Sequence, residues 1–380
     1  MLVLVIHFVV VGFEHHFGWI KPAFGWTWVG VDLFFVLSGY LLGGILIDNR
    51  NSDNYFKTFY VRRICRIFPL YFGFVGLLLS LRLFSPVLAA LIGLAEPAKP
   101  HQLPDWAYLC FIQNVYLGRF GFDVRNILWL GPTWSLAVEE QFYLMLPIIL
   151  RFLPVKRLLW LVIAAICFSM GLRTGIFLFH PYAVTMNFFL YPCRWDSMWI
   201  GVLAAWLVRQ PFFQPFAVQR RLMLGVLLHL SAIPVVLLFW EYRNLDSRAS
   251  VAMAFYGYTM IAVTAALLIL IAHIFPDGVI ARSFCWRPLR WLGKISFAVY
   301  LFHTMILELM HSLLYGKNPS LSAAQELVVV VSALAATLLV SALSWRFFES
   351  RIIAWGHRLQ YQSAGAGLLQ IPDVGSCKRT

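Results

Sequence analysis

Four groups of polar residues interrupt apolar stretches of this sequence, and the first of them is His7. The residue sits among Leu, Val, Ile and Phe in the run 1–13. An ionisable side chain at membrane depth is costly, so its presence is itself a functional hypothesis. An imidazole titrates near neutral pH and suits general-base chemistry. The alternative is a neutral histidine that is hydrogen-bonded within a helix bundle.

The second group is Asp32, in the string GVDLFF (30–35) that opens another apolar run. A carboxylate here can be the anion that the N-terminus of a helix favours. The functional alternatives are a partner that orients a catalytic base, or part of an acceptor site on the outer side of a membrane.

Three arginines, Arg62, Arg63 and Arg66, make up the third group. On a helix, spacings of three and four residues put Arg66 on one face with each of the others. Guanidinium groups bind phosphate oxygens in pairs, so this cluster suits a polyphosphate ligand. The alternative is an ordinary basic anchor that touches lipid headgroups at the cytoplasmic edge.

The fourth group lies in the string WSLAVEEQFY (134–143), which opens an apolar helix. Ser135, Glu139 and Tyr143 recur every four residues and line one helix face, whereas Glu140 points about 100° away. A capping and interface role is the alternative for both acids. Two adjacent carboxylates nevertheless exceed what a helix cap needs.

Weaker signals come from four further ionisable residues. Arg194 and Asp196 open an apolar run, where they can simply pair with each other. His303 lies within another run and can be a satisfied bundle histidine. Glu349 follows the last run and can pair with Arg346.

The elements that position these residues must be membrane helices. Hydrophobic residues make up 61% of the 380 residues and charged residues only 12%, against about 25% charged in a soluble domain. The net charge of +13 does not indicate nucleic acid, because Lys and Arg lie between apolar runs rather than on a soluble face. The six cysteines are scattered, without a CxxC pair or metal-ligand spacing. We therefore expect reduced thiols, no disulfide framework and no metal site.

A spanning helix needs about 20 mostly apolar residues. Apolar runs that fit this length lie at 1–13, 28–47, 68–86, 133–150, 158–176, 194–208, 222–240, 251–274, 295–313 and 325–345. The sequence thus predicts an all-α, polytopic membrane helix bundle of about ten transmembrane helices, the first of them apparently truncated.

The distribution of Lys and Arg predicts the orientation of the bundle. If the second span runs inward, 20 of the 30 Lys and Arg lie in cytoplasmic segments, as the positive-inside rule requires. Those segments are 48–68, 149–157, 209–221, 275–294 and 346–380. Both termini are then cytoplasmic. The segment 87–131 is an outer loop with one short membrane-dipping piece, and the polar tail beyond about residue 360 is expected to be disordered.

Several strings of the sequence resemble the acyltransferase-3 family of membrane acyltransferases, and they occur in the family's order. They are GVDLFFVLSGYLLGGIL (30–46), FYVRRICRIFPLYF (59–72), WSLAVEEQFYLMLP (134–147), RWDSMWIGVLAA (194–205), GKISFAVYLFHT (293–304) and WRFFES (345–350). The resemblance implies a membrane acyltransferase domain over 1–350, with 351–380 as a cytoplasmic tail. It also implies ten helices, a cytoplasmic acyl donor that is usually acyl-CoA, and an outer acceptor hydroxyl on a glycan or glycolipid.

The resemblance also assigns roles to single residues. His7 matches the first-helix histidine to which the family's general base is assigned, and Arg63 and Arg66 match its Arg-x-x-Arg pair. Glu139 matches the better kept of two acids. Other positions in the same motifs are matched by Asp32, Trp134 and Tyr143.

The sequence departs from the family pattern in three places. The family's first helix carries an arginine about ten residues before its histidine, whereas only six residues precede His7 here. We therefore expect the natural start to lie upstream of Met1. The proline that usually follows the region of His303, and the one that usually follows Glu349, are both missing. The matching strings end near residue 350, as in a single-domain form of the family.

Together these observations predict transfer of an acyl group, most often acetyl in this family, from cytoplasmic acetyl-CoA to an outer glycan hydroxyl. Acyl-CoA is then a donor substrate and no resident cofactor is expected. Arg63 and Arg66, with Arg62, hold the CoA phosphates; His7 takes the hydroxyl proton, and Glu139 or Asp32 orients the imidazole. The residues expected along the substrate path are Trp134, Ser135, Glu140, Tyr143 and His303.

Two alternatives belong to other classes. A proton-coupled transporter or flippase for a lipid-linked sugar would use the buried histidine and acids as a proton relay. An inactive relative would lack the first-helix arginine. In each case we expect an integral protein of the bacterial cytoplasmic (inner) membrane, with its oligomeric state left open.

Overall fold

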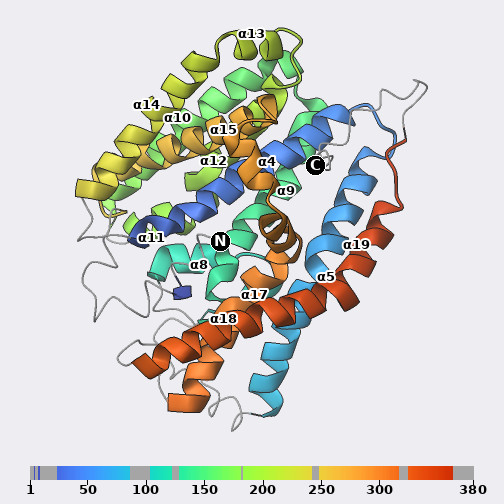
Figure 1. Cartoon of the computed structure of the whole chain (residues 1–380), viewed down its shortest axis with the longest axis vertical. Helices are drawn as coiled ribbons and strands as arrows, with labels where there is room; N and C mark the ends of the chain where they lie inside the picture. The colour runs from blue at the N-terminus through green and yellow to red at the C-terminus, as the bar shows by residue number, and fades with distance from the viewer. Residues whose placement is uncertain are drawn as a thin grey trace.

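The computed structural model describes residues 4, 7–8, 24–85, 103–121, 128–180, 183–241, 248–315 and 324–362. Over these residues the chain is a bundle of α-helices joined by short 3-10 and π-helical turns, and it contains no strand (Figure 1). The all-α membrane bundle predicted from composition is therefore confirmed.

The longer helices form the body of the bundle. They are α4 (Gly30–Asp48), α5 (Tyr55–Phe84), α9 (Trp134–Phe152), α10 (Leu158–Phe179), α12 (Trp195–Leu207), α14 (Arg221–Glu241), α15 (Tyr258–Ile274), α17 (Arg287–Tyr315) and α18 (Ala324–Ser344). Shorter elements connect or extend them: η2 (Gly25–Val29), α7 (Asp105–Leu109), α8 (Gln113–Phe120), η4 (Leu128–Thr133), η5 (Val155–Arg157), α11 (Ala183–Phe189), η6 (Tyr191–Arg194), α13 (Phe213–Gln219), η7 (Met253–Gly257), α16 (Val279–Cys285), η8 (Trp345–Glu349) and α19 (Ser350–His357).

Seven helical stretches among the described residues are long and apolar enough to span a membrane. They correspond to η2 with α4, α5, η5 with α10, α14, η7 with α15, α17, and α18 continued through η8 and α19. The predicted spans 133–150 and 194–208 also form helices, α9 and α12. α12 is only 13 residues long and α9 carries two glutamates, so neither has the length and apolarity of the seven. The count of ten stays a prediction, because most of the run 1–13 lies outside the described residues.

Two helices extend well beyond the apolar runs that predicted them. α5 begins at Tyr55, 13 residues before the expected start of its span, so the three arginines lie on a helix rather than in a loop. The last span continues through η8 and α19 to His357, where a tail was expected. Hydropathy locates the part of a helix that lies in lipid, and a helix can continue beyond that part. Disorder was predicted from about residue 360, yet Tyr361 and Gln362 are described and contact α5 and its start, and the rest of the tail, 363–380, lies outside the described residues.

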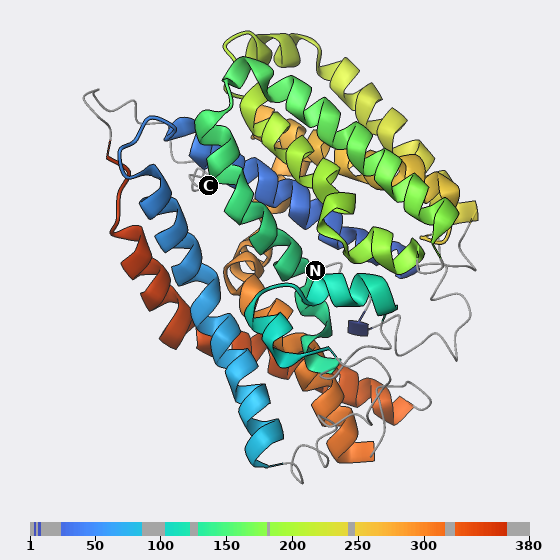
Figure 2. The same ribbon diagram turned by 180° about the vertical axis from the view of Figure 1, so that it is seen from behind.

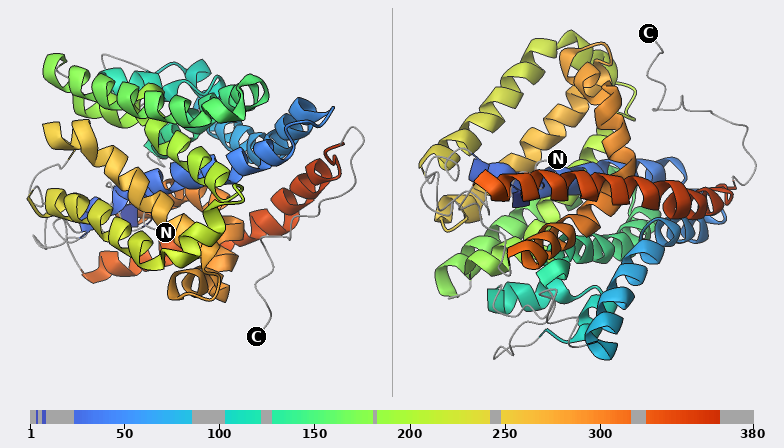
Figure 3. Two further views of the ribbon diagram at one scale, coloured as in Figure 1. Left: turned by 90° about the horizontal axis from the view of Figure 1, so that it is seen from above. Right: turned by 60° about the horizontal axis from the view of Figure 1, so that its bottom comes forward.

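The helices pack in two groups, with α9 between them. In one group α4 packs along α12, which also contacts α10 and α15, and α14 lies on α15. In the other group α17 packs on α18, and α19 runs beside α5 (Figure 2). The second view of Figure 3 shows α18 and α19 following one another as a long red rod across the bundle.

α4 and α12 approach each other through two glycines. Gly39 faces the backbone of Met198, and Gly201 faces the backbone of Val36. A methyl group at either glycine would collide with backbone atoms of the facing helix. Small residues that permit such a close crossing are common between membrane helices, where van der Waals packing drives association.

The outer surface of α14 shows why the bundle belongs in lipid. Its exposed side chains are almost all large and apolar, and they include Leu222, Val226, Leu230, Val236 and Trp240. An uncovered apolar face of this size is not stable in water.

The cysteines differ from expectation at one position. Cys65, Cys110, Cys167 and Cys193 are free thiols, as expected. Cys285, at the end of α16, is instead disulfide-bonded. This position is only half-buried and lies outside the apolar runs, so its thiol is not enclosed by a membrane core. The expectation of reduced thiols therefore does not hold at this cysteine.

Candidate active site

Glu139 lies at the meeting point of α9 and α4. The carboxylate is 2% exposed, and the Ser38 hydroxyl donates a hydrogen bond to its Oε1. The Tyr143 hydroxyl, one turn further along α9, donates to Ser38 Oγ at 3.3 Å. The face that the four-residue spacing predicted for Glu139 and Tyr143 thus meets a single serine of α4. Sequence reasoning did not single out Ser38, although it lies in the GVDLFFVLSGYLLGGIL string.

Arg63 of α5 faces these acids. Its guanidinium interacts electrostatically with Glu139, Glu140 and Tyr143. Glu140 is 8% exposed, and its Oε1 accepts no hydrogen bond from any described residue. Both adjacent carboxylates of α9 therefore interact electrostatically with a basic residue of α5, although no ion pair joins them to it among the described residues.

Arg66 lies one turn further along α5 and has a different acidic neighbour. Its charge acts on Glu349 of η8, which accepts a hydrogen bond from Ser344 at 2.9 Å. The expected pairing of Glu349 with Arg346 is not what the structure shows. Within the described chain, no group accepts a hydrogen bond from Arg63 or Arg66, so their donors remain available to a ligand.

Arg62 is held by the C-terminal segment 358–362. Its Nε and Nη2 donate to the carbonyl oxygen of Leu359 at 3.1 and 2.8 Å, and the guanidinium stacks over Tyr361 at 5.1 Å. Arg62 thus ties α5 to the residues after α19. This engagement separates it from Arg63 and Arg66, with which the sequence grouped it.

Ser135 and Tyr300 connect α9 to α17. Their hydroxyl oxygens are 3.0 Å apart, and the Tyr300 hydroxyl donates to the carbonyl oxygen of Pro132 at 2.6 Å. Tyr300 also interacts electrostatically with Glu139. Sequence reasoning missed Tyr300, although its position three residues before His303 puts both on one face of α17.

His303 and His7 meet beyond Tyr300. The His303 side chain is fully buried, and its ring lies 4.9 Å from that of His7, edge to face at 67°. His303 Nδ1 lies 2.7 Å from the carbonyl oxygen of Tyr300. The structure therefore brings two predicted site residues into direct contact, although they are almost 300 positions apart in the sequence.

These residues form a polar line through the bundle, in which the Arg63–Glu139 and Glu139–Tyr300 links are electrostatic interactions rather than hydrogen bonds. It runs from Arg63 to Glu139, then to Tyr300, His303 and His7. We use the term polar line for these five residues together with the three that adjoin them, Ser38, Ser135 and Tyr143.

Trp134, which was expected along the substrate path, packs among aromatic rings. Its ring contacts Phe188 at 4.8 Å, Phe189 at 4.9 Å and Phe35 at 6.2 Å between centroids. It is 6% exposed, so it belongs to an aromatic core between α4, α9 and α11. This packing holds the start of α9 in place.

Asp32 is part of a second buried polar region. Its carboxylate forms an ion pair with Arg194 and accepts a hydrogen bond from Ser197 Oγ at 3.2 Å. Arg194 in turn stacks over the ring of Tyr258 at 4.3 Å. The structure thus engages Asp32 with the start of α12. No described contact joins its carboxylate to His7, the imidazole that it was expected to orient.

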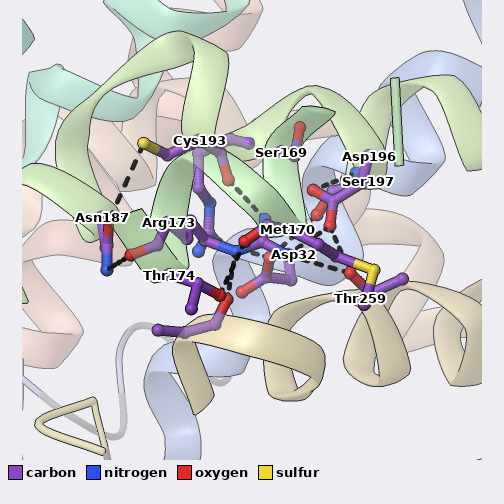
Figure 4. A network of polar contacts seen from close by, with 12 residues as sticks. Asp32, Ser169, Met170, Arg173, Thr174, Asn187, Cys193, Asp196, Ser197 and Thr259 are labelled. Carbon is purple, nitrogen blue, oxygen red and sulfur yellow. Dashed lines mark hydrogen bonds and ion pairs between the residues drawn. The ribbon is translucent and has the colours of Figure 1, made fainter. Parts of the chain in front are cut away.

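Asp196 pairs with an arginine that sequence reasoning missed. Arg173 of α10 lies 2.9 Å from Asp196 and donates further bonds to the carbonyl oxygens of Ala254 and Cys193 at 2.9 and 2.6 Å (Figure 4). Arg194 and Asp196 therefore form their ion pairs with other helices rather than with each other. Arg173 lies inside the predicted span 158–176, so the rule applied to His7 would have found it.

Comparison with known proteins agrees with the fold and with these motifs. A family model described as "Acyltransferase domain" matches residues 1–346. The chain therefore belongs to the acyltransferase-3 family of integral membrane acyltransferases. No solved structure matches it.

Curated relatives carry names that specify an activity. The chain is 27% identical over 357 residues to a protein named Peptidoglycan O-acetyltransferase OatA from Listeria monocytogenes, with 90% of this chain and 53% of the relative aligned. It is 26% identical over 349 residues to O-acetyltransferase OatA of Staphylococcus aureus, covering 88% and 53%. It is 27% identical over 365 residues to the Putative peptidoglycan O-acetyltransferase YrhL of Bacillus subtilis, covering 92% and 53%. The chain spans about half the length of these relatives.

Proposed function

We propose that this protein is a membrane O-acyltransferase that moves an acetyl group from cytoplasmic acyl-CoA to a hydroxyl of an extracytoplasmic glycan. The observation that carries the proposal is the polar line from Arg63 to His7 through the bundle. Ionisable groups at such depth are costly, and they occur where a substrate or a proton must pass. Peptidoglycan is the first acceptor to test, because two of the similar proteins carry that word in their names.

Arg63 and Arg66 form the donor end of the proposed site. Both lie on the half of α5 that begins at Tyr55, which is the cytoplasmic side in the orientation proposed from the Lys and Arg distribution. Their guanidinium groups have no hydrogen-bond acceptor within the described chain, so they can bind the phosphates of CoA with paired donors. Arg62, which is held by Leu359, supports this end by fixing the C-terminal segment against α5.

The chemical step takes place further along the polar line. His7 removes the proton from the acceptor hydroxyl as the hydroxyl oxygen attacks the thioester carbonyl carbon. A C–O ester bond forms, the C–S bond breaks, and the departing CoA sulfur takes the proton back from His7. General-base catalysis of this kind contributes about 10²–10⁴-fold to a rate. Glu139, predicted to orient the imidazole, accepts its hydrogen bond from Ser38 and has none with His7 among the described residues; its charge acts on Arg63.

Radiolabelled acetyl-CoA supplied to proteoliposomes tests both ends of the site. Replacement of His7 by alanine should lower acetyl transfer to a cell-wall glycan by about 10²–10⁴-fold and leave donor binding intact. The Arg63→Ala/Arg66→Ala variant should weaken donor binding by about tenfold or more, since one charge-assisted hydrogen bond contributes about 1.5–3 kcal/mol. Arg220→Ala/Arg221→Ala, which removes two neighbouring arginines from the α13–α14 junction, is the matched control.

Two results would overturn this proposal. Full acetyl transfer by His7→Ala would rule out His7 as the general base. Undiminished donor binding by the Arg63/Arg66 variant would rule out these arginines as the CoA site. Flux of a lipid-linked sugar driven by a proton gradient without any acyl donor would instead indicate the transporter.

A further inference from the structure

His303 has one ring nitrogen whose bonding is fixed and one whose bonding is not. Nδ1 lies 2.7 Å from the carbonyl oxygen of Tyr300, one turn earlier on α17. A carbonyl can only accept a hydrogen bond, so Nδ1 carries a proton. In a neutral imidazole the other nitrogen, Nε2, is then an acceptor with a free lone pair.

That acceptor has no partner within the described chain. His303 is fully buried, and no described group donates a hydrogen bond to Nε2. A buried acceptor without a donor costs about 1–3 kcal/mol, so native structures retain few of them. The ring that adjoins His303 is that of His7, edge to face with centroids 4.9 Å apart. An unsatisfied proton acceptor thus lies directly beside the proposed base.

We propose that His303 is a positioning partner of His7 and receives a proton through it during acyl transfer. The inference rests on the proposed function, in which His7 takes the proton of the acceptor hydroxyl. Nε2 of His303 is not hydrogen-bonded to His7 in this structure, so the His7 ring must first turn toward it. As one nitrogen of His7 gains that proton, its other nitrogen then passes a proton to Nε2 of His303. His303 then carries the positive charge, and its Nδ1–H remains bonded to the Tyr300 carbonyl, a contact that strengthens when the donor is cationic.

The proton returns along the same path when the C–S bond of the thioester breaks. The C–S bond breaks, the CoA sulfur takes a proton from His7, and His303 returns its proton to His7. Both histidines are neutral again, and the ester bond is the only covalent bond gained by the acceptor. The Tyr300 carbonyl accepts a hydrogen bond from Nδ1–H and so holds one tautomer of His303 throughout. Nε2 therefore remains the nitrogen that accepts the proton from His7.

Two substitutions separate the functions of the two ring nitrogens. In His303→Asn the side-chain amide can still donate to the Tyr300 carbonyl, but no group remains at the Nε2 position. In His303→Gln a polar amide reaches the Nε2 position and can bond to His7, but it cannot take a proton. We expect kcat to fall by about 10²–10⁴-fold in His303→Asn, with the KM for acetyl-CoA unchanged, and by less in His303→Gln. His229→Gln is the matched control, because His229 makes the same Nδ1-to-carbonyl contact at 2.7 Å on the exposed side of α14.

A double-mutant cycle with His7→Ala distinguishes a dyad from a merely structural histidine. Residues that act as a unit are strongly non-additive, so His7→Ala/His303→Asn should be no slower than His7→Ala alone. Losses that multiply, or a His303→Asn enzyme within twofold of the wild-type kcat, overturn the inference. Should His303→Asn fail to fold, His303→Gln carries the same cycle. The proposed function fails separately, since its failure is full transfer by His7→Ala whatever His303 does.

Discussion

Two buried polar regions of the bundle, one around Arg173 and one along the polar line, differ in how far the protein satisfies them. Around Arg173, all three guanidinium nitrogens donate to described acceptors, and Asp196 accepts from Arg173, Thr259 and the Ser197 backbone. On the polar line, His303 Nε2 has no hydrogen-bond partner among the described residues, and neither has Oε1 of Glu140, which follows Glu139 on α9. Both regions contain costly buried groups. The difference teaches that burial of a polar side chain alone does not indicate function, because the protein can satisfy such a group completely.

The Asp32–Arg194 pair lies between these extremes. Ser197 supports it and Tyr258 stacks on it. Asp32 Oδ2 and two of the guanidinium nitrogens of Arg194 have no hydrogen-bond partner in the described part of the chain. The pair therefore combines a structural ion pair with spare hydrogen-bonding capacity.

The largest effect is expected from a substitution in the region around Arg173, where every guanidinium nitrogen is hydrogen-bonded. Arg173→Met leaves the buried Asp196 carboxylate without its cation and should lower the free energy of unfolding by about 3–5 kcal/mol. Thermal unfolding of the detergent-solubilised protein measures the change. The double variant Arg173→Met/Asp196→Leu removes both charges and should recover most of the loss. A single variant as stable as the wild type would show that the ion pair does not hold α10 to α12.

The second effect concerns activity rather than stability. Glu139→Gln keeps the size of the side chain and an oxygen that can accept from Ser38, but removes the charge that faces Arg63. Acetyl transfer should fall by about 10²–10³-fold, the usual cost of removing one well-placed electrostatic group. The unfolding temperature should hardly change. Glu241→Gln at the exposed end of α14 is the control; equal rates for both variants would remove Glu139 from the site.

These two results depend on features that the sequence predicted unequally. The face of α9 followed from the four-residue spacing of Ser135, Glu139 and Tyr143. The residues that contact this face could not be predicted in the same way, because Ser38 and Tyr300 belong to other helices and no spacing pattern in those helices marks them. Arg173 was missed although it lies within an apolar run. Helix packing decides which faces meet, and no single-helix pattern contains that information.

The third effect tests the crossing of α4 and α12. Gly201→Ala introduces a methyl group against the backbone of Val36 and should destabilise the bundle by about 1–3 kcal/mol. Gly171→Ala on α10 is the matched control, because no atom lies within 4 Å of its new methyl group. That control should be neutral or stabilising by up to about 1 kcal/mol, from helix propensity alone. Equal stability of the two variants would show that the crossing tolerates a wider spacing.

The smallest effect is expected where a charge pair is partly exposed. Arg209 donates to both carboxylate oxygens of Asp48 at 2.6 Å, with about a quarter of each side chain exposed. Asp48→Asn should cost only about 0.2–1 kcal/mol, because solvent screens the pair. The loss should shrink further in high salt. A loss as large as that of Arg173→Met would contradict the distinction between buried and exposed pairs.

The glycine crossing has a consequence for motion. With no side chain between them at Gly39 and Gly201, a shift of α4 along α12 would bring larger side chains against the facing backbone. The Arg173 contacts fasten α10 and α15 to the same pair. These four helices therefore form one interlocked unit, in which a shift of α4 or α12 would have to carry α10 and α15 with it.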